Sequence, residues 1–218
     1  MRTVREMKLV ALVALATLAV AGTALAARGD PRERFAPADQ ARAQAMLLRQ
    51  TDFSVAFVSR PSSSSGNDFY CSAIDESDLT LTGKATSPNF TAQTEYVVST
   101  GYVYASRVDS NASWRRGVSK AGERCLRLGT RAQLQRGSAR FVSFKRLAFP
   151  PRGDRSVAYR AIATQQGIHL YIDVVAMQIG RAQAAVIYGS ALVPPPQGEL
   201  KRVTATVATR TRKAMRGA

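Results

Sequence analysis

The chain has 218 residues, of which 31 are Lys or Arg and 15 are Asp or Glu, so its formal net charge is +16. Such a charge favours anionic partners, including cell-envelope polymers and lipid head groups. The basic residues are spread along the chain and form no nucleic-acid-binding motif, which argues against specific nucleic-acid binding. The single histidine excludes the usual metal sites built from two or three histidines.

Residues 1–26 have the three parts of a secretory signal peptide. Arg2, Arg5 and Lys8 are basic, an apolar run follows, and Ala24-Leu25-Ala26 places small residues at the positions that a signal peptidase reads. The alternative is an uncleaved membrane anchor, because the run approaches the roughly 20 apolar residues that span a bilayer. The Ala-, Gly- and Thr-rich end favours cleavage. We therefore expect a secreted or cell-envelope protein that contacts the membrane only if this segment is retained.

The two cysteines, Cys71 and Cys125, are predicted to form a disulfide. An exported protein meets an oxidising compartment, where a single pair of cysteines is most simply one bridge. The chain-entropy model gives a bridge over such a long loop a stabilisation of about 4 kcal/mol. The alternative is two free thiols buried as small apolar groups.

The first half of the chain alternates between polar segments and periodic ones. Residues 27–36 are charged and predict a tether, and residues 37–49 repeat apolar side chains at helical spacing after a proline. Residues 79–105 are rich in β-branched and aromatic side chains, which predicts strands. Trp114, Val118, Ala121, Cys125 and Leu128 then form the strongest helical stripe of the chain, with the only Trp and one cysteine on its buried side.

The second half predicts an antiparallel sheet closed by a helix. Strands are expected over residues 140–149, 157–164, 168–178 and 182–188, with a two-residue hairpin turn at Gly180 and Arg181. Residues 198–215 form an amphipathic helix with a basic end. We predict a single α+β domain over residues 37–216. Its twisted antiparallel sheet should have about five to seven strands, with helices packed on it and the N- and C-terminal helices flanking.

Catalytic motifs are missing from the sequence. There is no G-x-S-x-G or S-x-x-K motif and no phosphate-binding glycine pattern. His169 and Asp173 lie four residues apart on one strand, about 13 Å at strand rise, so they cannot bond to each other directly. Asp75, Glu76 and Asp78 lack the spacing of a calcium loop and are better explained as turn caps. We predict no enzyme activity, no catalytic residue, no metal site and no cofactor.

Tyrosines on the predicted strands are the remaining functional signal. An amphipathic aromatic surface can line a ligand cleft, although tyrosines can also simply border a half-covered core. We predict that Tyr159, His169 and Tyr171 are ligand-binding residues on one cleft-facing side of the sheet.

Several local strings resemble the PknH-like extracellular sensor domains of actinobacterial receptor kinases and related small exported proteins with a PsbP-like fold. The matching strings are residues 46–53, residues 78–83 after Cys71, Trp114 leading to Cys125 and Leu126, residues 147–150 with 153–156, Gly180 with Arg181, and residues 207–210. The resemblance implies a twisted antiparallel sheet with helices, a family disulfide at the two cysteines and a cleft for an unidentified ligand. It supplies no catalytic residues. The sequence departs from the family in having no kinase domain and no lipid-carrying cysteine.

The expected function is an exported, non-catalytic binding or sensor-like module at the cell surface. The first alternative is a basic structural protein of the envelope, held by charge to anionic wall or membrane polymers. The second is a hydrolase, which would require Ser or Asp within hydrogen-bond reach of His169 in a deep pocket.

Overall fold

The computed structural model describes residues 29–54, 56–62 and 70–216, so the predicted signal peptide lies outside the described residues. The strands are β1 (Arg32–Glu33), β2 (Val58–Arg60), β3 (Thr80–Thr86), β4 (Asn89–Ala92), β5 (Glu95–Tyr104), β6 (Arg140–Arg146), β7 (Arg155–Gln165), β8 (Ile168–Ile179) and β9 (Ala182–Ala191). The helices are α2 (Pro37–Ala45), α3 (Arg107–Val118), α4 (Lys120–Arg136) and α5 (Gln197–Met215), with 3-10 turns η2 (Gln50–Asp52) and η3 (Ser72–Ile74).

The strands form one sheet in the order β1-β3-β5-β9-β8-β7-β6, with β4 pairing to β5 and β2 pairing to β4. All pairings are antiparallel except that between β1 and β3. The predicted α+β fold is therefore confirmed. In the described part of the chain the sheet has nine strands, more than the five to seven expected, because the very short β1, β2 and β4 lack a sequence pattern of their own.

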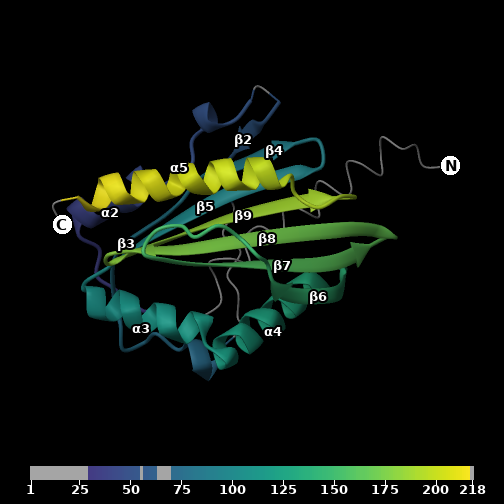
Figure 1. The fold of residues 1–218 in the computed structure, drawn as a ribbon. Coiled ribbons are helices and arrows are strands. Elements are labelled where there is room, and N and C mark those ends of the chain that lie inside the picture. The colour runs from purple at the N-terminus through teal and green to yellow at the C-terminus, as the bar shows by residue number, and fades with distance from the viewer. Residues whose placement is uncertain (1–28, 55, 63–69, 217–218) are drawn as a thin grey trace.

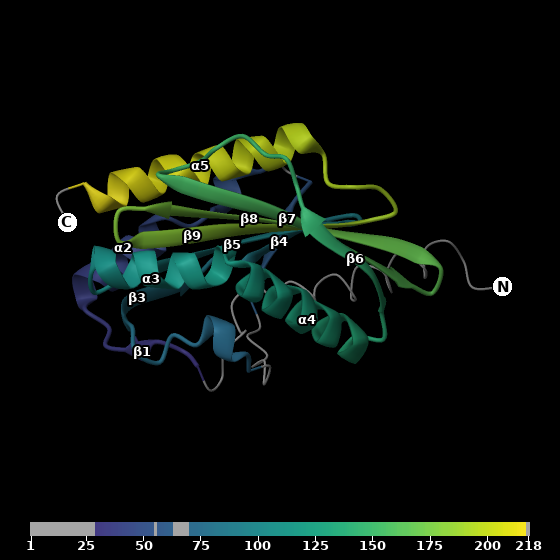
Figure 2. The same ribbon diagram turned by 60° about the horizontal axis from the view of Figure 1, so that its bottom comes forward.

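Helices cover both faces of the sheet (Figure 1). The pair α2 and α5 lies on one face, and the pair α3 and α4 lies on the other, as the turned view in Figure 2 also shows. Alternation along β9 serves both layers: Val186 and Tyr188 pack with Leu200 of α5, whereas Ile187 packs with Leu134 of α4. No helix in the described part of the chain is long and apolar enough to cross a membrane.

The hairpin between β8 and β9 turns at the two predicted residues. Gly180 has a φ of +60°, which suits glycine, and Ile179 pairs with Ala182 across the turn. The guanidinium of Arg181 then reaches α2, where it bonds both carboxylate oxygens of Asp39 at 2.7 and 2.8 Å. The turn therefore fixes both the register of the central strands and the position of α2.

Two predicted helices differ from the structure. The first ends at Ala45 rather than at residue 49. The stripe from Trp114 to Leu128 belongs to two helices, because Ser119 has a ψ of 158° and breaks the chain direction between α3 and α4. Trp114 and Cys125 are buried as expected, but Leu128 is 42% exposed.

The segment predicted as a polar tether is partly bound to the sheet. Arg32 and Glu33 form β1, which pairs in parallel with Thr80 and Leu81 of β3. The backbone N–H groups of Arg34 and Ala36 also donate to carbonyls of residues 81 and 82. The polar composition gave no sign of this pairing, since it is made by backbone groups.

Candidate ligand-binding site

A cavity of about 260 Å³ lies between the sheet and the helices α3 and α4, with Gly29, Asp30, Pro31 and Glu33 at its border. A water molecule occupies about 30 Å³ of liquid, so the space exceeds that of a single structural water. It approaches the roughly 300 Å³ at which ligand pockets of small molecules begin. The opposite face, under α2 and α5, holds the largest cluster of buried hydrophobic residues.

Small side chains on the sheet create this space. Thr100, Ala185, Ala176 and Val157 are consecutive partners across β5, β9, β8 and β7, and all four line the cavity. The neighbouring positions on the other face, such as Val186 and Met177, carry larger side chains that fill the core. Because the row crosses four strands spaced about 4.8 Å apart, the floor of the cavity is elongated across the sheet.

The break between α3 and α4 forms the roof. The hydroxyl of Ser119 accepts from the Gly122 N–H at 2.9 Å and donates to the Arg116 carbonyl at 2.8 Å, which caps both helices at once. A Cβ at Gly122 would lie 2.0 Å from that same carbonyl, so the tight turn requires glycine. Trp114 and Val118 of α3 and Leu126 of α4 face the cavity on either side of this turn.

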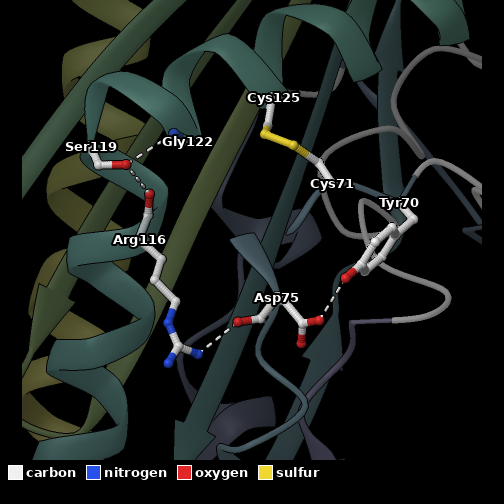
Figure 3. The surroundings of a disulfide bond; sticks show 7 residues. All are labelled: Tyr70, Cys71, Asp75, Arg116, Ser119, Gly122 and Cys125. Atoms are coloured by element: carbon white, nitrogen blue, oxygen red, sulfur yellow. Dashed lines mark hydrogen bonds between the residues drawn. A yellow bond between two sulfur atoms is a disulfide. The ribbon is translucent and has the colours of Figure 1, made fainter. Parts of the chain in front are cut away.

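The disulfide between Cys71 and Cys125 is present and holds the side wall to the roof. Figure 3 shows Cys125 of α4 joined to Cys71 at the start of η3, with Arg116 of α3 directed at the carbonyl of Asp75. Arg116 also binds both carboxylate oxygens of Asp78, at 2.6 and 2.7 Å. Ile74, between these attachment points, lines the cavity. The covalent bond and the ion pair together fix the segment 71–78 against both helices.

Two buried hydroxyl groups in the cavity wall find no hydrogen-bond partner among the described residues. Thr100 is 2% exposed and its Oγ1 is unsatisfied, on the floor of the cavity. Tyr159 is 4% exposed, and its Oη on the β7 side has no hydrogen bond of normal geometry, although Glu123 and Arg146 lie close enough to act on it. A buried polar group without a partner is costly, so such groups call for an unseen partner such as water or a ligand.

A carboxylate also lines the cavity. Glu76 accepts a hydrogen bond of 3.0 Å from the hydroxyl of Tyr104, which lies 2.8 Å from Ser113 Oγ. Burial raises the pKa of Glu76 above its ordinary 4.5, an effect opposed by the hydrogen bonds from Ser113 and Tyr104 and by the charge of Arg116. The cavity therefore has apolar walls with an acidic group on one side and hydroxyl groups within it.

The three residues predicted to bind a ligand do not share one cleft. Tyr159 lines the cavity, where its ring stacks on Phe144 with centroids 5.1 Å apart. His169 and Tyr171 alternate on β8 with Ile172 and Val174, so they point to the other face of the sheet. The expected grouping is wrong because the register of β7 on β8 places Tyr159 opposite Val174, not opposite Tyr171.

The other polar candidates are also separated. Asp173 is fully buried and forms a bidentate ion pair with Arg160, both bonds being 2.6 Å long, so it is engaged away from His169. In the acidic cluster, Asp75 accepts from Ser77 and Tyr70, Asp78 pairs with Arg116, and Glu76 alone lines the cavity. No group of three or more metal-ligating side chains occurs within the described ranges.

Sequence reasoning missed Glu76, Thr100 and Trp114 as lining residues. The sequence pattern predicts Trp114 as a core residue and Glu76 as a turn cap. The row of small residues had a partial signal, because the predicted turn at Gly180 already implies that Ala176 pairs with Ala185. Comparison with known proteins adds no assignment: no family model matches the chain, and no curated protein is significantly similar to it.

Proposed function

We propose that the protein is an exported, non-catalytic binding module whose ligand occupies the cavity between the sheet and α3–α4. The observation that carries this proposal is the unsatisfied hydroxyl of Thr100, almost fully buried in an otherwise apolar wall. A structural core would favour an apolar side chain there, whereas a binding site uses a few placed polar groups in apolar surroundings.

Other features support binding over catalysis. The single histidine is exposed on the far face of the sheet, away from the cavity. The disulfide is compatible with an oxidising compartment and stiffens the wall that a ligand would touch. The resemblance to PknH-like sensor domains, which stays a prediction, also implies a cleft for a ligand.

The test is to fill the cavity. Leucine at Ala185 would occupy the floor, and Ala121→Leu adds the same atoms on the exposed side of α4 as a matched control. The probe is phenylnaphthylamine, an uncharged dye that fluoresces in apolar sites, added to protein purified from cells expressing the full chain. We expect saturable binding of one dye per chain, lost in Ala185→Leu and retained in Ala121→Leu. Equal binding by both variants would show that the cavity is not the site.

The second candidate function is attachment to anionic envelope polymers. It is favoured by the exposed basic end of α5, where Arg212, Lys213 and Arg216 face solvent. Arg210 is not part of this surface, because it binds both carboxylate oxygens of Asp52. Attachment by charge alone should bind any polyanion and weaken steeply as salt shortens the screening length. Envelope binding that survives high salt would favour the cavity.

A further inference from the structure

The border of the cavity has a charge opposite to that of the protein. The chain carries a formal charge of +16, yet the described Asp, Glu, Lys and Arg residues that line the cavity are three acidic ones, Asp30, Glu33 and Glu76, and one basic one, Lys84. Lys84 Nζ lies 2.9 Å from Glu33 Oε1, which neutralises that pair. Asp30 and Glu76 are left as the net negative charge of the site.

The nearest strong cation does not neutralise Glu76. Arg116 lies close enough to lower the pKa of Glu76, but its guanidinium forms the bidentate pair with Asp78 and donates to the Asp75 carbonyl. The direct partners of Glu76 are instead the neutral hydroxyls of Tyr104 and Ser113, and Tyr104 is only 4% exposed. A partly buried carboxylate with neutral partners is destabilised in its charged form, and a bound cation would relieve this cost.

The surroundings of the carboxylate suit a cation with an apolar body. Tyr104, which bonds Glu76, lines the cavity together with Trp114 and Tyr102, and aromatic faces attract ammonium groups. From there the floor continues through the row that begins at Thr100 and ends at Val157, which offers mainly apolar contact. A carboxylate ligand would instead meet like charge at Asp30 and Glu76.

We propose that the ligand is an amphiphilic cation, in which a protonated amine or quaternary ammonium group meets Glu76 and Asp30 and an apolar body lies over the row of small residues. This inference rests on the proposed function, since it assigns a ligand class to the same cavity. The Thr100 hydroxyl, at the first position of that row, can bond a polar group of the ligand.

The experiment compares three molecules of equal chain length: octylamine, octanol and octanoate. Binding is followed at neutral pH through the fluorescence of Trp114, the only tryptophan, which lies in the cavity wall. Octylamine should bind about tenfold more tightly than octanol, because a charge-assisted hydrogen bond is markedly stronger than a neutral one, and octanoate should bind most weakly. Lengthening the amine by one methylene should improve affinity about fourfold while the cavity has room.

Two variants distinguish the effect of the Glu76 carboxylate from that of the protein's net charge. Glu76→Gln should reduce octylamine binding about tenfold and leave octanol binding unchanged. Glu95→Gln removes the same charge at a half-buried position outside the cavity, and should leave both unchanged. Equal loss in both variants, or octanol binding as tightly as octylamine, would overturn the cation assignment while dye binding still upheld the cavity. Failure of the dye and of all three probes to bind would overturn the proposed function itself.

Discussion

The two faces of the sheet are built differently. On the face of α2 and α5, backbone approaches backbone: a Cβ at Gly83 would lie 2.3 Å from the Asp39 carbonyl oxygen, and one at Gly101 would lie 2.9 Å from that of Ala43. On the face of α3 and α4, small side chains leave a cavity with an unsatisfied hydroxyl and a strained carboxylate. Close packing stabilises a fold, whereas unsatisfied groups around a space are typical of sites kept for binding.

If the disulfide stabilises the face covered by α3 and α4, its removal should have the largest effect on stability. Replacing Cys71 and Cys125 together by Ser opens a bridge that spans 54 residues. The chain-entropy model gives a loss of about 4 kcal/mol in the free energy of unfolding, measured by urea denaturation. Hydrogen exchange should rise first in η3 and α4 and least in α5. Uniform loss of protection across both faces would contradict this division.

The face covered by α2 and α5 depends on the charge of Asp39 rather than on a disulfide. Asp39 is 6% exposed and accepts hydrogen bonds from Arg181, Thr82 and Arg42. Asp39→Asn leaves Arg181 without its anion and should cost about 3 kcal/mol. The hydrogen bonds from Arg181 hold the pKa of Asp39 below its ordinary 3.8, so this stabilisation is present above pH 3.8 and disappears as the pH falls through the lowered value.

The control for Asp39→Asn is to measure stability over a range of pH. The difference in unfolding free energy between the parent protein and Asp39→Asn should be constant near neutrality and shrink in acid. Thr82→Val, which removes only one hydroxyl from the same carboxylate, should cost about 1 kcal/mol. A gap that stayed constant into strong acid would mean that Asp39 acts through packing alone.

A matched pair of enlarged side chains compares the faces directly. Gly83→Ala pushes a methyl group against the backbone of α2 and should cost about 2 kcal/mol, since overpacking forces the backbone to shift. Ala185→Val adds two methyl groups on the cavity floor and should change stability by less than about 1 kcal/mol. Thermal unfolding of both variants measures these changes in stability. Equal losses would show that the cavity closes in solution.

Local patterns predicted most of the central sheet. Period-two alternation over residues 168–178, together with the glycine turn, identified β8, β9 and their pairing, and from these the small pair Ala176 and Ala185 follows. What alternation could not supply is the register of β7 on its neighbour β8. Tyr159 was therefore grouped with Tyr171, although their side chains lie on opposite faces.

The break between α3 and α4, which forms the roof of the cavity, could not be predicted for a different reason. A helical stripe continued in phase from Trp114 to Cys125, so periodicity alone predicted one helix. The break depends on the capping hydroxyl of Ser119 and on the missing Cβ of Gly122, which act over one turn. Glu76 was missed because its environment is formed by Tyr104 and Ser113, both far from it in sequence.

The smallest expected effect concerns Glu76 and has the opposite sign to the others. Burial raises the pKa of this carboxyl above 4.5, so the folded protein holds its proton more readily than the unfolded chain does. Its contribution to stability is therefore fully present below pH 4.5 and is lost as the pH rises through the raised value. Glu76→Gln keeps an acceptor for Tyr104 without the charge, and should raise Tm at neutral pH by about 1–3 °C.

The pH profile decides whether this gain comes from the charge. The advantage of Glu76→Gln should be absent in acid, grow as the pH rises above 4.5 and level off once the folded carboxyl is ionised. Glu95→Gln is a weaker control of the same kind, because burial also raises the pKa of Glu95. A Tm gain at Glu76 that did not vary with pH would mean that the amide packs better. In that case the carboxylate would not be under electrostatic strain, and the contrast between the two faces would rest on the cavity and Thr100 alone.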